Sequence, residues 1–253
     1  MSEAVVHALY RYPVKGFSPE PLTEAVLTAG ETMALDRAYA IENGPSGFDP
    51  AEPKHFPKIR FLMLMKNARL AGLASRLDPQ TRELTIRRDG AVLARGRLDQ
   101  AEGRAAIEAF LATEFADELR GPPRVLEAPG FSFSDVARKV LHVVNLASVR
   151  DLARFVGRPV DPLRFRANVY VDGIPAWSEF DWIGQGLAAP GVTLVGVKRT
   201  ERCAATNVDP TSAARDMEIP RTLMGVFGHT DCGIYARVES DGVLKVGDPI
   251  RVA

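Results

Sequence analysis

Short apolar runs, broken every few residues by glycine or proline, constrain the fold of this chain most. The chain has 21 glycines and 18 prolines, and most apolar stretches end before a helix could form. An Asp89-Gly90 pair between two such runs is typical of a hairpin turn. We expect strands at 5–12, 25–30, 37–41, 81–94 (a hairpin), 142–146, 167–171, 192–197, 225–228, 234–238, 243–246 and 249–252. The pattern predicts a mainly β, α+β chain with barrel-like sheets and small helices. The strands at 225–228, 234–238 and 243–246 are expected to close a barrel.

Two segments show helical features. Residues 100–115 carry Ala, Ile and Phe at helical spacing, and residues 148–156 are predicted to begin at Ser148 as N-cap and to end at Gly157. The prolines and glycines of 43–57 indicate a loop over an open edge or cleft. The Gly-Pro-Pro at 121–123 is the best boundary, so we expect domains at 1–121 and 122–253.

The balance of charge excludes some partners. Lys+Arg and Asp+Glu both number 32, so neither nucleic acid nor an anionic membrane is favoured as a global partner. The first residues do not form a secretory signal, and no apolar run approaches the roughly 20 residues that span a bilayer. We therefore expect a cytoplasmic protein without an integral membrane segment. Its two cysteines cannot by themselves hold a four-cysteine metal site.

One of these cysteines lies in a segment suited to chemistry. Cys203 follows Arg202 directly, just after the apolar run 192–197. A neighbouring guanidinium favours the thiolate, which is both a soft metal ligand and a nucleophile. A buried, inert cysteine is the ordinary alternative. Cys232 lies in a turn-like context, and there we prefer that structural interpretation.

A second segment is suited to an anion. Arg164 and Arg166 flank Phe165, no acidic residue lies among them, and two arginines on one face of a strand could clamp a phosphate. The alternative is an exposed edge with ordinary ion pairs. A soft ligand close to an anion clamp suggests a phosphorylated, metal-bearing cofactor.

These segments together resemble the MOSC family, named for the C-terminal domain of molybdenum cofactor sulfurase. The similarity is greatest to the branch in which an N-terminal β-barrel-like domain precedes the MOSC β-barrel domain, as in the mitochondrial amidoxime-reducing component and its bacterial relatives. The resemblance is carried by the segments 12–16 (Tyr-Pro-Val-Lys-Gly), 35–37 (Leu-Asp-Arg), 145–148 (Asn-Leu-Ala-Ser), 164–168 (Arg-Phe-Arg-Ala-Asn), 202–210 and 246–249 (Val-Gly-Asp-Pro).

The resemblance implies a molybdenum cofactor, a molybdenum-bearing molybdopterin. Cys203 matches the cysteine that ligates the metal and takes part in catalysis. The cofactor-binding elements of the family map onto Lys15, Arg37, Ala147, Ser148, Arg166, Asn168, Arg202, Thr206 and Asp209. Several of these positions keep a simpler explanation: Asp36 could pair with Arg37, Ser148 could only cap a helix, and Asp209 could only form a turn.

The implied activity is that of an oxidoreductase, with reductive loss of oxygen from small N-hydroxylated substrates such as amidoximes and hydroxylamines. Electrons are expected from a separate donor protein of the ferredoxin or cytochrome b5 type. Two alternatives remain open. One is a sulfur carrier with a persulfide on Cys203, and the other is a non-catalytic carrier of the cofactor.

Overall fold

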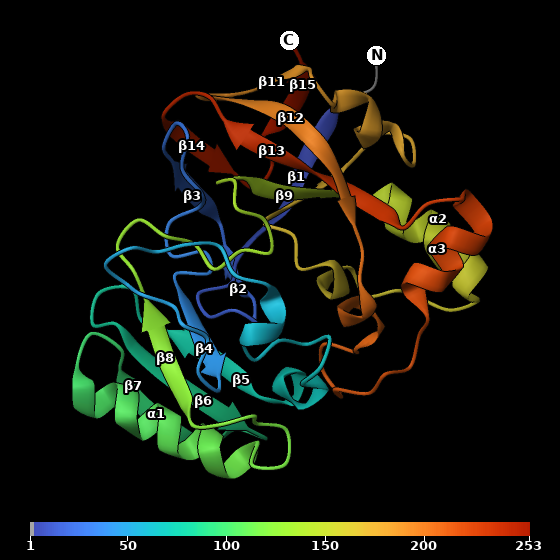
Figure 1. Ribbon diagram of the computed structural model, residues 1–253. Coiled ribbons are helices and arrows are strands. Elements are labelled where there is room, and N and C mark those ends of the chain that lie inside the picture. The colour runs from blue at the N-terminus through green and yellow to red at the C-terminus, as the bar shows by residue number, and fades with distance from the viewer. Residues whose placement is uncertain (1–2) are drawn as a thin grey trace.

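A closed β-barrel forms the upper half of the molecule in Figure 1. The structure, a computed structural model, describes residues 3–253. The barrel runs in the order β1 (Ala4–Arg11), β10 (Val169–Asp172), β9 (Leu141–Asn145), β13 (Asp231–Val238), β12 (Val192–Glu201), β11 (Gly186–Ala189) and β15 (Pro249–Val252), which pairs again with β1. β9 and β10 run parallel, whereas β12 and β13 form a long antiparallel pair with two register shifts.

A second, smaller lobe lies below the barrel and is built from local pairings (Figure 1). β5 (Ala74–Leu77), β6 (Glu83–Arg88) and β7 (Ala91–Arg97) form one antiparallel sheet, and β4 (Tyr39–Asn43) pairs with β8 (Pro123–Glu127). Helix α1 (Ala101–Glu114) buries Ile107 and Leu111 against them. The hairpin at Asp89-Gly90 and this helix confirm the sequence-based expectation.

Two short helices cover one side of the barrel. α2 (Leu146–Val156) and α3 (Ile219–Phe227) bury Leu152 and Leu223 in a shared apolar cluster. The short strands β2 (Glu20–Leu22), β3 (Glu24–Leu27) and β14 (Gly242–Lys245) complete the described strands, with β2 paired to β1 and β3 paired to β14. Among the helices of residues 3–253, none has the length and apolar character needed to cross a membrane.

The α+β class, with a barrel and small helices, is confirmed, but three local expectations were wrong. Residues 225–227 belong to α3, and Gly228 is its C-cap, so this segment is not a strand. The N-cap of α2 is Asn145, whose side chain accepts from the amide of Ala147, so α2 begins before Ser148. β14 pairs with β3 outside the barrel.

Four strand pairs cross the expected boundary at residue 121: β1 with β10 and with β15, β3 with β14, and β4 with β8. β1, from the first segment, is a barrel strand, and β8, from the second, pairs with β4 of the smaller lobe. The chain therefore passes between the lobes several times, and loops from both lobes meet where they adjoin. The division at 121/122 stays a prediction.

Candidate active site

A pocket of about 300 Å³ is lined by residues of both lobes. The smaller lobe and its loops contribute Lys15, Lys58 and the apolar run 63–65, whereas the barrel side contributes the segments 164–168 and 201–203. Seven cationic side chains line it against three acidic ones: Lys15, Arg37, Lys58, Arg164, Arg166, Lys198 and Arg202 against Asp36, Asp135 and Glu201. This surplus of positive charge suits an anionic ligand.

Cys203 lies where β12 has ended and a single turn of 3-10 helix, Ala204–Asn207, begins. The amide and the hydroxyl of Thr206 donate to the Cys203 carbonyl at 3.0 and 2.9 Å, which fixes the backbone of the turn. The side chain is partly exposed and lines the pocket. Thr206 itself is buried, so its part is to hold the cysteine turn rather than to face the pocket.

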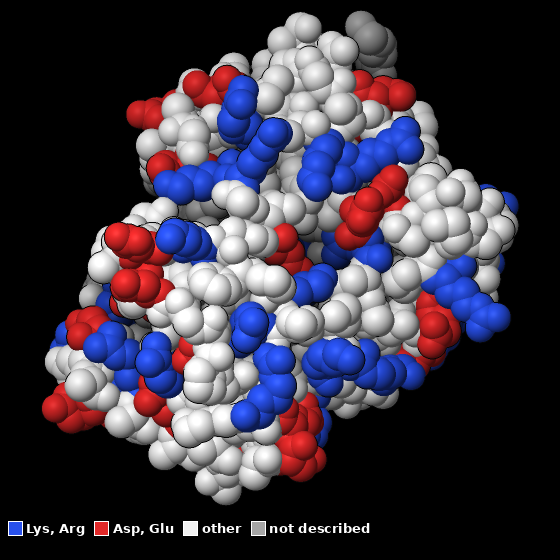
Figure 2. Space-filling model, in the orientation of Figure 1, with Lys and Arg blue, Asp and Glu red and all other residues white. Residues whose placement is uncertain are grey.

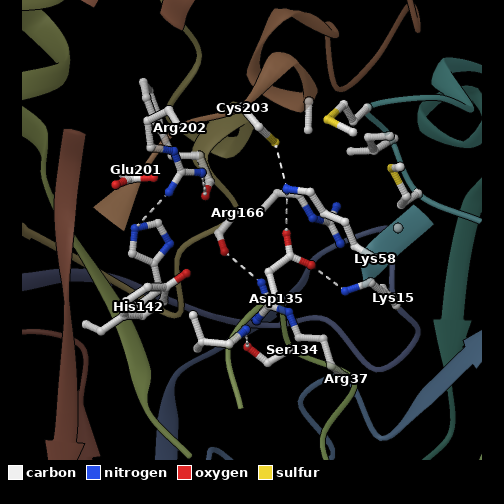
Figure 3. A pocket seen from close by; sticks show the side chains of 18 of the residues that line it. Lys15, Arg37, Lys58, Ser134, Asp135, His142, Arg166, Glu201, Arg202 and Cys203 are labelled. Atoms are coloured by element: carbon white, nitrogen blue, oxygen red, sulfur yellow. Dashed lines mark hydrogen bonds and ion pairs between the residues drawn. The ribbon is translucent and has the colours of Figure 1, made fainter. Parts of the chain in front are cut away.

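A lysine that the sequence analysis did not single out contacts the sulfur. The ammonium of Lys58 lies 3.2 Å from Cys203 Sγ and 3.2 Å from a carboxylate oxygen of Asp135 (Figure 3). Although burial favours the neutral amine, Asp135 and Cys203 raise the pKa of Lys58. A positive charge at this distance stabilises negative charge on sulfur.

Asp135 joins this lysine to a second one. Its other carboxylate oxygen pairs with Lys15, whose ammonium also donates to the Phe133 carbonyl at 2.8 Å. Burial lowers the pKa of Lys15, with Asp135 acting in the opposite direction. Although partial burial raises the pKa of Asp135, the two ammonium groups hold that pKa well below its usual range. The three side chains form a connected line from Lys15 to the sulfur (Figure 3).

The guanidinium groups of Arg37 and Arg166 enclose the ring of Tyr12, at 4.4 and 4.3 Å from its centroid. Arg37 also donates to the Arg166 carbonyl at 2.9 Å and pairs with Asp36, which confirms that simpler role for Asp36. Burial lowers the pKa of Arg166 to about 10. Its Nη1 donates to the Phe17 carbonyl at 2.8 Å, but its buried Nη2 has no hydrogen-bond partner within residues 3–253.

Arg202 closes the barrel side of the pocket. It donates to the Phe165 carbonyl at 2.7 Å and lies 3.2 Å from Nε2 of His142, while its buried Nε lacks a partner in the described part of the chain. Burial, together with the charges of Arg202 and Arg37, lowers the pKa of His142 well below its usual value, so the imidazole is neutral. Asn168 also lines the pocket, but its amide bonds the backbone of His142 and Tyr10.

The structure does not bring every predicted residue to the pocket. Ala147 and Ser148 lie in α2, away from the lining, and the Ser148 hydroxyl is fully buried and donates to the carboxylate of Glu179. Asp209 caps the turn at 211–212 and pairs with Arg164 at 2.8 Å. None of these three residues lies among the described lining residues of the pocket.

The expectation that Arg164 and Arg166 share one face of a strand was wrong. Residues 162–165 form a 3-10 helix, and Arg166 ends it in the left-handed conformation with φ 53°. Arg164 is buried and pairs with Asp209 and Asp216, so its acidic partners come from a distant segment. Arg164 also donates to the Asn207 carbonyl at 3.2 Å and so holds the cysteine turn, while Arg166 faces the pocket.

Gly16 shows why the chain has no larger residue after Lys15. Its φ is +84°, and a Cβ there would lie 3.1 Å from the Leu62 carbonyl oxygen and 3.1 Å from Leu70. Positive φ and close backbone approach both favour glycine. The tight turn brings Lys15 toward Asp135.

The side chains of the pocket fit a metal whose other ligands belong to a bound cofactor. Within residues 3–253 there is no group of three or more His, Cys, Asp or Glu side chains that could hold a metal ion. Cys203 is the single thiol among the described lining residues of the pocket, and a thiolate is a soft, anionic metal ligand. The orphaned Nη2 of Arg166 and Nε of Arg202 are donors suited to an anionic group such as phosphate.

Comparison with known proteins identifies the family. The MOSC domain matches residues 128–251, and the MOSC N-terminal beta barrel domain matches residues 3–117. The chain belongs to the MOSC family. The two MOSC matches leave residues 118–127 between them, and β8 lies within this interval.

Curated relatives of this MOSC protein are similar over part of their length. Mitochondrial amidoxime reducing component 2 of Rattus norvegicus is 30% identical over 122 residues, which is 44% of this chain and 36% of the relative. Mitochondrial amidoxime-reducing component 1 of Homo sapiens is 27% identical over 120 residues, covering 43% of this chain and 35% of the relative. The matches thus span about a third of these relatives. The YUAD protein from Bacillus subtilis aligns over 99% of this chain and 97% of its own, with 14% identity and a TM-score of 0.46.

Proposed function

We propose that this protein binds a molybdenum cofactor at the pocket and reduces N-hydroxylated substrates such as amidoximes and hydroxylamines. The observation that carries the proposal is the accessible sulfur of Cys203 in a pocket with a surplus of cations. Membership of the MOSC family supports a molybdenum-cofactor-related function. The names of the curated relatives support the reductive direction, at about 30% identity over part of their length.

In the proposed complex, Cys203 ligates the metal, while Arg166 and Arg202 bind the anionic part of the cofactor through their unpartnered nitrogens. Arg37 stiffens this side, because it holds the Arg166 carbonyl and stacks on the same tyrosine ring. When bound, the cofactor supplies the redox centre for removing oxygen. Removal of the hydroxyl oxygen breaks the N–O bond, consumes two electrons and two protons, and releases water.

The remaining lining residues shape the substrate side. Asp135 and Lys58 place a paired charge beside the sulfur, and the apolar run 63–65 with Val136 and Val140 provides a wall for the body of a small substrate. Such a wall excludes water from one side of the pocket and leaves polar groups at its base.

A reductase assay tests the proposal. Protein produced with cofactor is given benzamidoxime and dithionite-reduced methyl viologen, and we expect formation of benzamidine that is lost in Cys203→Ser. Activity that survives in Cys203→Ser would contradict the proposal. Cyanide-releasable sulfur that disappears in Cys203→Ala, from protein without molybdenum, would instead favour the sulfur carrier. Bound pterin without turnover would favour the cofactor carrier.

A further inference from the structure

Exposed cations without acidic partners gather around the mouth of the pocket. We call six of them the collar: Arg60, Lys66, Arg120, Arg138, Lys198 and Arg215. All six are exposed, and none lies within 4.0 Å of a carboxylate of residues 3–253, in contrast to pairs such as Arg88–Glu114 and Arg97–Asp99 of the smaller lobe. The chain as a whole has a formal net charge of +0, so this is a local asymmetry rather than a general excess.

Backbone contacts tie the lower part of the collar to the pocket wall. Arg215 donates to the carbonyls of Leu64 and Met65 at 3.1 and 2.8 Å, and both of these residues line the pocket. Arg120 donates to the carbonyl of Ile59, directly after Lys58. Lys66 follows Met65 in the chain. Arg215 and Arg120 are therefore held by the backbone next to the pocket wall, and Arg60 follows Ile59 in the chain as Lys66 follows Met65.

The barrel contributes the upper part. Lys198 lines the pocket itself, and Arg138 lines an adjoining hollow that shares Val140 with the pocket. That hollow is also lined by Lys139 and Arg237, which pair with Glu31 and Glu239. Figure 2 shows Lys and Arg gathered around the hollow of this face, over both lobes. Glu201 and Asp135 are the acidic residues at the mouth, and Asp135 is already held by two lysines.

We infer that the collar is a docking surface for an acidic electron-donor protein. The inference rests on the proposed function, because each turnover consumes two electrons that must reach the pocket from outside. A negatively charged protein seated on cations from both lobes lies directly over the mouth that leads to Cys203. Unpaired, exposed charges act mainly on encounter and orientation, and salt screens them with a Debye length of about 8 Å at physiological ionic strength. A one-electron donor docks twice in each turnover.

Two variants of equal net charge distinguish a specific effect of the collar from an effect of the total charge of the protein. The collar variant combines Lys66→Glu and Arg138→Glu, two exposed residues outside the proposed binding machinery. The control combines Arg76→Glu in β5 and Arg221→Glu in α3, which are also exposed and without a carboxylate partner in the described structure. Each substitution lowers the net charge by two, so both variants carry the same total charge.

The holoenzyme is assayed with benzamidoxime and three electron donors: an acidic plant-type ferredoxin, the haem domain of cytochrome b5, and reduced methyl viologen. With at least one donor protein, we expect kcat/KM of the collar variant to fall about tenfold at about 50 mM NaCl, and wild type to fall about tenfold when salt is raised to about 300 mM. The control should stay within about twofold of wild type, and the viologen rate of both variants should do so too.

The outcomes distinguish the two proposals. Equal kcat/KM of the collar and control variants with both donor proteins overturns the docking surface, while viologen turnover leaves the proposed function intact. Absence of turnover with every donor contradicts the proposed function, and the collar is then judged by binding of each donor protein to wild type and variants at low salt. Tighter binding of a short DNA duplex than of either donor protein would also overturn the inference, because it would make the collar a polyanion site.

Discussion

The ammonium of Lys58 lies 3.2 Å from the sulfur of Cys203, although the two residues are 145 positions apart and belong to opposite sides of the pocket. Lys58 directly follows the proline-rich stretch 43–57, and Cys203 follows the longest barrel strand. The contact joins both lobes at the atom that the proposed chemistry needs.

This contact predicts charge-selective alkylation in cofactor-free protein. Replacing Lys58 by Met removes the cation beside the sulfur, so the rate of reaction with anionic iodoacetate should fall about three- to tenfold more than the rate with neutral iodoacetamide. Mass spectrometry of Cys203 at fixed pH gives both rates. Cys232 should stay unlabelled, because it is fully buried and burial raises the pKa of its thiol.

Lys54→Met is the matched control, because Lys54 is an exposed lysine of the same loop whose nearest acid is Glu52. An equal change in the ratio of the two rates for Lys54→Met and Lys58→Met would show that the contact does not persist in solution.

The buried ammonium of Lys15 depends on Asp135. Replacing Asp135 by Asn removes the negative charge and leaves a buried cation with only the Phe133 carbonyl, so we expect a loss of about 1–3 kcal/mol in unfolding free energy. Urea denaturation measures this value. In a Lys15→Met background no buried ammonium is left without its partner, so Asp135→Asn should lower the unfolding free energy by clearly less there. Additive effects would mean that the two side chains are not coupled.

The same pair predicts a direction of pH dependence. The pKa of Asp135 is lowered in the folded state, so its ionised form stabilises the fold above its usual pKa of about 4, and this contribution is lost as the pH falls through the lowered value. The difference in stability between wild type and Asp135→Asn should therefore be constant near neutral pH and shrink below about pH 4. A difference that grows on acidification would contradict the assigned ion pairs.

The sequence predicted those site residues that belong to a short local pattern. Lys15, Arg37, Arg166, Asn168, Arg202 and Cys203 were all singled out from short segments, and the structure places all of them on one pocket. Lys58 and Asp135 were missed, because their roles arise from loops that meet only in three dimensions. A possible signal was the position of Lys58 directly after the proline-rich stretch.

Local patterns gave wrong predictions where contacts with distant residues decide the role or the conformation of a residue. Ser148 was predicted to begin a helix as N-cap and to bind the cofactor, but Asn145 caps the helix and the Ser148 hydroxyl donates to Glu179. Arg164 looked unpaired, because its partners Asp209 and Asp216 lie more than forty residues away. Residues 225–228 were assigned to a strand from their apolar character, whereas 225–227 end α3, where Phe227 packs on the apolar cluster shared with α2, and Gly228 is the C-cap.

The stack of Tyr12 between two arginines predicts unequal effects of two substitutions. Tyr12→Phe keeps the ring and removes a buried hydroxyl that lacks a hydrogen-bond partner within residues 3–253, so stability should change by less than about 1 kcal/mol. Tyr12→Leu loses the ring under Arg37 and Arg166 and should cost about 2–4 kcal/mol. Denaturation of both variants without cofactor measures this. Equal losses would show that the hydroxyl, rather than the ring, is what matters.

The molybdenum-to-protein ratio of cofactor-replete wild type and Cys203→Ala tests the central claim most directly. Cys203 carries the single thiol among the described lining residues, so we expect near-stoichiometric metal in wild type and a ratio at least about tenfold lower in the variant, with the same circular dichroism spectrum. Equal molybdenum in both proteins, or none in wild type produced with a full supply of cofactor, would contradict the assignment of Cys203 as the ligand.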